Sequence, residues 1–192
     1  MNSGCKLIAG ALTTMALATS AMVVLPYLQV RDLDPPQELQ PYTAQELRGR
    51  SQYITLGCMY CHTQQPRGAE SGVDFQRGWG RASLPQDYTY DSPHLLGTMR
   101  TGPDLLNIGA RQPSIDWHLG HLYQPRAYVV GSNMPAFPFL FEHKLQAEAG
   151  EYAVTLPPSE APEAGVIVAR PEAMDLVKYL LSLDRTYPAP SE

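Results

Sequence analysis

The sequence predicts a mainly α-helical protein in which one N-terminal transmembrane helix precedes a small domain with long loops. Residues 7–28 form an uncharged apolar run, capping signals mark several short helices, and 18 prolines and 15 glycines interrupt the rest. With 192 residues, 44% of them apolar, the chain is long enough for one anchored domain with a hydrophobic core. The formal net charge is −5 without a basic run, so nucleic acid is not expected as a partner.

The N-terminal apolar run is long enough to cross a membrane. At ~1.5 Å per residue, a helix over residues 7–28 spans the ~30 Å hydrocarbon core of a bilayer. Lys6 precedes the run and Arg31 and two aspartates follow it, which weakly favours a cytoplasmic N-terminus and export of the remainder. An Ala-x-Ala cleavage signal at 16–18 is the alternative. Because the apolar run continues well past it, beyond the ~7–15 residues usual in signal peptides, a retained anchor over residues 1–30 is favoured.

A polar, proline-containing linker at 31–41 is expected to join the anchor to a domain at 42–187, with a tail at 188–192. Thr43 and Glu46 form a capping box, which predicts that the first helix of the domain begins here. The apolar side of this helix is expected to comprise Leu47, Ile54 and Leu56.

Short elements are expected in the middle of the domain. Residues 66–97 are rich in Gly, Pro, Ser and Asp, which predicts mostly loop. Residues 101–111 predict a helical turn closed by Gly109, and residues 113–125 predict a short helix capped by Ser114.

The C-terminal part is expected to combine an irregular loop, an acidic segment and a final helix. Prolines prevent regular structure in 131–139. Residues 142–170 are interpreted as an acidic insertion, in which EYAVTLPP and AGVIVARP pair as a small hairpin. Pro171 starts the last helix. Its apolar face is expected to contain Ala173, Val177, Leu180 and Leu181.

The motif Cys58-x-x-Cys61-His62 has three chemical interpretations. A structural zinc site needs four ligands, and the only other cysteine is Cys5, beside the anchor. A thioredoxin-like dithiol belongs at the start of a helix in a βαβ unit, whereas this pair follows a helix. The adjacent histidine fits the third interpretation, in which both thiols attach one haem c covalently and His62 is an axial iron ligand.

A second axial ligand must then come from elsewhere in the chain. The candidates are Met59, Met99, Met134, Met174, His94, His118, His121 and His143. Met134 is favoured because it lies beside Pro135 on a loop that cannot form a helix or strand, and thioether ligation raises the reduction potential. A histidine or Met99 remains the alternative.

Two further features could support a haem. The carbonyl of Pro103 could accept the second ring proton of His62, although an ordinary turn explains Pro103 equally well. Arginine forks such as Arg100 and Arg126 could bind the haem propionates. Arginine enrichment as a compositional habit explains the same observation.

The ordered series GCMYCH, GPDL, NMP and a closing helix LVKYLLSL resembles a class I cytochrome c. More narrowly, the segments PYTAQELRGRSQYITLGCMYCHTQQPR, RTGPDLLNIGAR and DWHLGHLYQPRAYVVGSNMPAFPFL, with one N-terminal anchor, resemble the monohaem cytochrome c subunit of cbb3-type cytochrome c oxidases. The resemblance implies a class I cytochrome c-like haem domain with Cys58 and Cys61 as attachment sites, His62 and Met134 as axial ligands, and Pro103 beside His62.

The resemblance also implies a bacterial inner-membrane protein whose haem domain lies in the periplasm. Its partners would be a polytopic haem–copper oxidase subunit, to which it relays electrons, and other c-type cytochromes as donors. Residues 68–97 and 142–170 depart from the family pattern. The alternatives are therefore a subunit of a related nitric oxide reductase, a self-standing membrane-tethered electron shuttle, or a non-haem dithiol or metal-binding protein.

Overall fold

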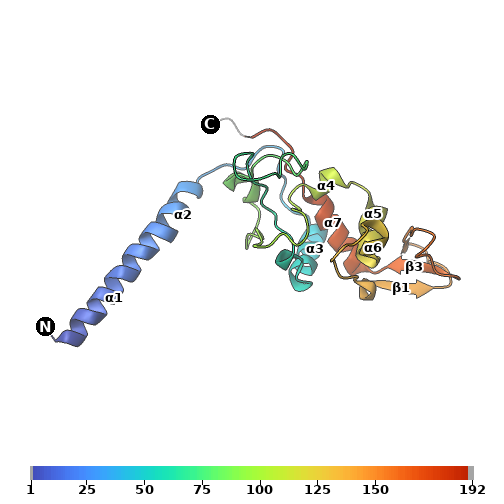
Figure 1. Ribbon diagram of the computed structural model, residues 1–192, viewed down its shortest axis with the longest axis horizontal. Helices are drawn as coiled ribbons and strands as arrows, with labels where there is room; N and C mark the ends of the chain where they lie inside the picture. The colour runs from blue at the N-terminus through green and yellow to red at the C-terminus, as the bar shows by residue number, and fades with distance from the viewer. Residues whose placement is uncertain (1, 190–192) are drawn as a thin grey trace.

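The computed structural model describes residues 2–189, so the first residue of the expected anchor and the last three residues of the expected tail lie outside it. A mainly helical domain follows one N-terminal apolar helix, as predicted (Figure 1). The helix runs without a break through α1 (Ser3–Thr19), the π-helical turn η1 (Ser20–Val24) and α2 (Leu25–Val30). The helix has 28 residues, and an 18-residue stretch of it has a mean hydropathy of 1.9 and is not buried, so the helix is long and apolar enough to cross a membrane. The π-helical turn has a local cause, since Pro26 cannot donate to the preceding turn.

The linker after α2 is partly packed on the domain. It contains no helix, but a turn in which Leu39 N donates to Pro36 O at 3.0 Å buries both side chains. The chain from Pro36 onward is therefore part of the folded domain and not a free spacer.

Helices α3 (Ala44–Thr55) and α7 (Pro171–Ser182) pack against each other at the centre of the domain (Figure 1). The predicted capping box is present: Thr43 N donates to Glu46 Oε2 at 2.7 Å, and Glu46 N donates to Thr43 Oγ1 at 3.3 Å. A Cβ on Gly49 would lie 1.9 Å from Asp175 O, so the missing side chain is what permits this close approach.

The predicted apolar side of α3 is confirmed for Leu56, which packs against the core, and is wrong for the other two residues. Leu47 and Ile54 are 51% and 38% exposed, and the buried residues of α3 are Gly49, Arg50 and Tyr53. The face that contains Gly49 packs against α7, because it allows the backbones of α3 and α7 to approach most closely.

The last helix begins at Pro171 as predicted. Leu176 and Tyr179 are fully buried in it, whereas the expected Leu181 is only partly buried.

The middle of the domain contains only short elements. They are η2 (Cys58–Tyr60), η3 (Pro85–Tyr88), α4 (Ile108–Arg111), α5 (Ile115–Tyr123), α6 (Pro125–Tyr128) and η4 (Pro138–Leu140). The prediction of mostly loop at 66–97 is confirmed, as is the Ser114 cap, whose Oγ accepts from Trp117 N at 3.2 Å. Gly109 does not close α4 but lies inside it, where a Cβ would be 2.2 Å from Leu181 O of α7.

Buried carboxylates hold the long loop at 66–97 in place. Asp87 accepts from two nitrogens of Arg81 at 2.8 Å each and from Tyr187 Oη at 2.9 Å. Asp91 accepts from Arg50 Nε at 3.1 Å. Because both carboxylates are almost fully buried and paired, they fix a segment that has little regular structure of its own.

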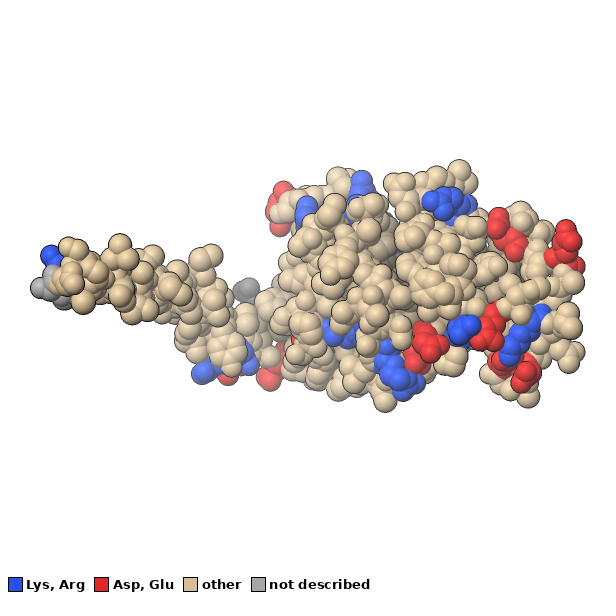
Figure 2. Space-filling model, turned by 90° about the horizontal axis from the view of Figure 1, so that it is seen from below, with Lys and Arg blue, Asp and Glu red and all other residues tan. Residues whose placement is uncertain are grey.

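The expected acidic insertion is an integral part of the domain. Strands β1 (Phe141–Lys144), β2 (Tyr152–Ala153) and β3 (Val166–Ala169) form an antiparallel sheet in the order β1-β3-β2. The predicted hairpin pairing of β2 with β3 is confirmed, whereas β1 was not predicted. Acidic side chains gather at this end of the molecule, farthest from the anchor (Figure 2). Lys144 of β1 lies 3.6 Å from Glu148 and 3.9 Å from Glu142.

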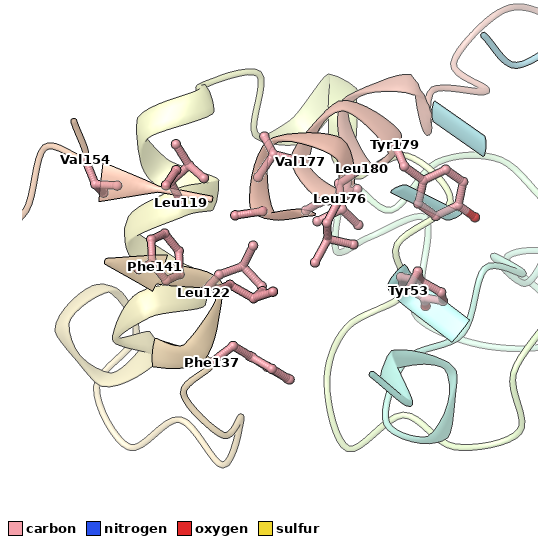
Figure 3. Packing of buried hydrophobic residues seen from close by; sticks show 14 of the residues in the cluster. Tyr53, Leu119, Leu122, Phe137, Phe141, Val154, Leu176, Val177, Tyr179 and Leu180 are labelled. Atoms are coloured by element: carbon pink, nitrogen blue, oxygen red, sulfur yellow. The ribbon is translucent and has the colours of Figure 1, made fainter. Parts of the chain in front are cut away.

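One hydrophobic core joins the helices to the sheet (Figure 3). Leu176 and Leu180 of α7 face Tyr53 of α3 on one side, and Leu119 of α5 packs with Phe141 of β1 on the other. Phe137 extends from its loop toward the turn that follows α3 (Figure 3).

Gly49→Ala is expected to destabilise the domain by about 1–3 kcal/mol, because the new methyl group overlaps Asp175 O and forces α3 away from α7. The loss should appear although alanine by itself favours a helix over glycine by ~1 kcal/mol. Urea unfolding of the full chain measures the effect. Ser51→Ala, at an exposed position of α3, is the control and should stay within about ±0.5 kcal/mol of the wild type. Equal stability of both variants would contradict the close crossing.

Candidate functional site

A cavity of about 410 Å³ lies between the turn after α3, the loop before α4, helix α5 and the loop after α6. This volume is within the range of ~300–1,000 Å³ that is usual for cofactor sites. Its apolar wall includes Leu105, Ile108, Leu122, Phe137 and Leu180. The Cys58, Cys61 and His62 motif lines one side, and Met134 lines the cavity as well.

A left-handed glycine starts the turn that presents the cysteine motif. Gly57 has φ 74°, which ends α3 and directs the chain into η2. His62 N then donates to Cys58 O at 3.0 Å, so the backbone folds back on itself over the motif. This local turn brings both thiols and the imidazole to the same cavity.

The His62 imidazole is oriented by the loop before α4. Its Nδ1–H donates to Pro103 O at 2.7 Å, which leaves Nε2 unprotonated. Burial lowers the pKa of His62, so the ring is neutral at neutral pH. A Cβ on Gly102 would lie 2.2 Å from His62 Cε1, and the ring therefore requires glycine at this position.

Asp104 ties the loop before α4 to the chain that follows His62. Its carboxylate is fully buried and accepts from Thr63 Oγ1 at 2.6 Å, Gln65 N at 2.7 Å and Leu106 N at 2.9 Å. Burial raises the pKa of Asp104, while the three donors favour its ionised form. The loop that bears the Pro103 carbonyl is thereby fixed relative to the imidazole.

The cysteines are not arranged as a reactive dithiol. Burial raises the pKa of the Cys58 thiol to about 11, whereas a redox-active cysteine requires a lowered pKa. Within residues 2–189, no three His, Cys, Asp or Glu side chains come together in a group suited to a metal ion. Cys58 therefore has the environment of a buried thiol beside an apolar cavity.

Only some of the expected axial ligands reach the cavity. Of the eight methionines and histidines considered, Met134, His118 and His121 line it. Met99 is 58% exposed and lies outside the lining, and His143 Nε2 donates to Ala164 O at the sheet. Met134 is partly buried and packs against the core from its loop.

Helix α5 places the rings of Trp117 and His121 together at the cavity, a pairing that the sequence did not predict. The rings of Trp117 and His121 stack with centroids 4.6 Å apart at an interplanar angle of 8°. His118 Nε2 donates to Gln112 O at 2.8 Å. His121 Nδ1 is buried without a hydrogen-bond partner among the described residues. The i,i+3 spacing of the two histidines was the available signal, since it puts them on one face of a helix.

The structure does not bring Arg100 or Arg126 to the cavity. Arg100 Nη1 donates to Asp74 at 2.6 Å, and its other nitrogens bond to Thr63 and Gln65, so its guanidinium is already occupied. Arg126 is exposed on α6 and does not line the cavity. The expectation that these two arginines serve the site is therefore not supported.

Arg111 is the arginine with unused binding capacity. Burial lowers its pKa, and no described residue offers a partner to its buried Nε. Its guanidinium lies 5.9 Å from the centre of the Trp79 ring and its charge contributes to the lowered pKa of His62. Arg111 is half-buried, and its Nη2 donates to Asp104 O, so only Nε lacks a partner among the described residues.

The fold and the cavity define a class of protein: a mainly helical domain, built around a cavity with a Cys-x-x-Cys-His turn, on one long apolar helix. A family model described as "Cytochrome C oxidase, mono-heme subunit/FixO" matches residues 3–157, from the anchor through β2. The chain belongs to this family, the monohaem subunits of cbb3-type cytochrome c oxidases. No curated protein matches the chain. The match confirms the family resemblance and includes β1 and β2, while α7 lies outside the matched residues.

The residues of the cavity fit the single haem that the family name implies. Two thiols and a neutral imidazole with a free Nε2 share one side of an apolar cavity. His121, which lines the cavity, has a buried Nδ1 that the described residues leave without a partner. The collision of a Gly102 Cβ with the His62 ring shows how closely the loop encloses the imidazole.

Gly102→Ala is expected to displace the His62 ring and break its hydrogen bond to Pro103, because the methyl group would occupy the position of Cε1. We expect less haem per chain and a partial change of the bound haem from low to high spin. Absorption spectra of the purified full chain measure both effects. Gly72→Ala is the matched control, since a Cβ there meets nothing closer than 3.7 Å. Identical spectra for the wild type and Gly102→Ala would contradict the enclosed position of the ring.

Proposed function

We propose that this chain relays electrons from other c-type cytochromes to the haem–copper catalytic subunit of the oxidase, through one covalently held haem. The observation that supports the proposal is the meeting of Cys58, Cys61, His62 and Met134 at one cavity in a member of this family. A haem supplies one-electron chemistry without proton or group transfer.

The cysteine turn holds the group in place. Cys58 and Cys61 would hold the haem through thioether bonds beside η2. His62 offers Nε2 as the first axial ligand, and Pro103 O keeps the proton on Nδ1.

Met134, on another wall of the cavity, would hold the haem iron through its thioether sulfur. Its loop ends where Phe137 N donates to Leu122 O of α5 at 2.9 Å, which connects the methionine to the wall of the cavity. A thioether donates less strongly than imidazole and thereby favours the reduced state. The apolar wall would limit the access of water to the haem.

The proposed domain arrangement follows from the anchor. The N-terminal helix anchors the chain in the bacterial inner membrane, and residues 36–187 form the electron-transfer domain on the periplasmic side. Because the chain belongs to a family of oxidase subunits, a role in an oxidase is favoured over a role in a nitric oxide reductase. A self-standing shuttle is the second candidate, and co-purification distinguishes it.

Met134→His is expected to keep a low-spin haem but to lower its potential on the order of 0.1 V, within the ~0.8 V that axial ligands span. The near-infrared band of sulfur ligation should disappear, and oxygen consumption with a c-type donor should fall. Redox titration and an oxygen electrode measure these effects on the purified complex. Met99→His, at an exposed position outside the cavity, is the control and should behave as the wild type. A surviving band in Met134→His would exclude Met134 as the ligand, and unchanged oxygen consumption despite a lowered potential would argue against the relay.

Exchange of residues 7–28 for a leucine-rich span of equal length tests whether the anchor also binds the catalytic subunit. The natural span contains alanines and threonines, and small residues allow helices to approach closely in lipid. We expect the haem domain to mature, co-purification with the catalytic subunit to be lost, and oxygen consumption to fall at least several-fold. Unchanged assembly and turnover would reduce the helix to a tether and favour the shuttle.

A further inference from the structure

His121 is a nitrogen donor at the cavity whose bonding capacity is not used. Its Nδ1 is buried and has no partner among residues 2–189. The ring is held flat against Trp117, with centroids 4.6 Å apart, and lies edge-on to Tyr128 at 6.2 Å. The Tyr128 hydroxyl does not serve His121, because it donates to Thr155 O at 3.2 Å.

The other histidine of α5 is differently placed. His118 Nε2 donates to Gln112 O at 2.8 Å, which leaves only Nδ1 free, on a side chain that is 3% exposed and almost fully enclosed. The three lysines of the chain lie elsewhere, on α1, β1 and α7, and none lines the cavity. The cysteine motif, Trp117 and His118 are thus set aside. Among the described residues that line the cavity, the remaining side chains that can bind iron through nitrogen or sulfur are Met134 and His121.

These two donors are supported very differently. His121 is on α5, whose Leu119 and Leu122 are buried in the core. Tyr128 packs so closely on this helix that a Cβ on Gly120 would lie 1.8 Å from its hydroxyl. Met134 belongs to a loop in which Gly131, Asn133 and Pro135 are exposed, and its backbone N donates to Ser132 Oγ, only two residues away, at 3.2 Å. If this loop moved, the sulfur would leave the cavity while the imidazole stayed in place on α5.

We propose that His121 is an alternative axial ligand, which replaces Met134 when the loop at 131–136 moves away from the cavity. In this exchange the iron–sulfur bond to Met134 breaks and an iron–nitrogen bond to His121 forms, with no electron transferred. The inference rests on the proposed haem site and adds a regulatory state to it. With two imidazole ligands the potential falls, so electron entry slows, and the iron stays closed to small ligands such as carbon monoxide.

The test uses the haem-loaded full chain, purified in detergent without the catalytic subunit. Pyridine haemochrome absorbance of denatured protein first establishes the covalent haem content of every variant. Met134→Ala is expected to lack the near-infrared sulfur band yet to remain low-spin and to bind no carbon monoxide when reduced. Met134→Ala with His121→Phe, which keeps a flat ring against Trp117, is expected to be high-spin and to bind carbon monoxide. Met134→Ala with His143→Phe, at an exposed position on β1, is the control and should remain low-spin.

A second measurement leaves Met134 intact and decides the question if the double variant does not accumulate. In rising urea, the wild type should lose the sulfur band while remaining low-spin and helical. His121→Phe should keep the band without urea and become high-spin as the band is lost.

Each result has a distinct meaning. Absence of covalent haem from the wild type would overturn the proposed function and this inference together. Covalent haem with a high-spin Met134→Ala would overturn this inference alone, as would a low-spin double variant. Loss of the sulfur band in the single variant His121→Phe would assign His121 to the positioning of Met134 and would also overturn it.

Discussion

The connection between the chain after Cys61 and the loop before α4 is the constraint on which the site depends. Gly102 N donates to Cys61 O at 2.9 Å and Leu105 N donates to Thr63 O at 2.8 Å, so the two segments are joined by their backbones. Asp104 reinforces this connection from within the core. The His62–Pro103 hydrogen bond then follows, because neither partner is free to move away. A neutral imidazole with one free nitrogen is thus a product of backbone geometry rather than of local sequence.

The rest of the domain supports this connection from two directions. On one side, the close crossing of α3 and α7 at Gly49 sets the position from which Gly57 turns the chain into the cysteine motif. On the other side, buried ion pairs fix the long loop at 66–97, which has almost no regular structure. Hydrophobic packing therefore positions the helices, while paired charges order the chain between them.

The two sides of the cavity differ in rigidity, and this difference matters for electron transfer. The histidine side belongs to a hydrogen-bonded unit that includes a fully buried carboxylate. The methionine side belongs to an exposed loop with few internal contacts. In most proteins, exposed loops open at a lower free-energy cost than the core does. A ligand on such a loop can therefore be exchanged without unfolding of the core. The potential of the relay would then respond to events at the loop, where a partner subunit could act.

The sequence by itself determined the apolar anchor, the capping box at Thr43, the helix start at Pro171, the hairpin of β2 with β3, and the family. These are local signals, in which neighbouring residues satisfy one another's backbone groups or share a short period. Only the tertiary structure decided that Gly49 rather than Leu47 faces α7, that the guanidinium of Arg100 pairs with Asp74 instead of reaching the cavity, and that His121 lies at the cavity. Each of these outcomes depends on a competition between distant residues for the same space or the same hydrogen bond, and such a competition leaves no periodic trace in the chain.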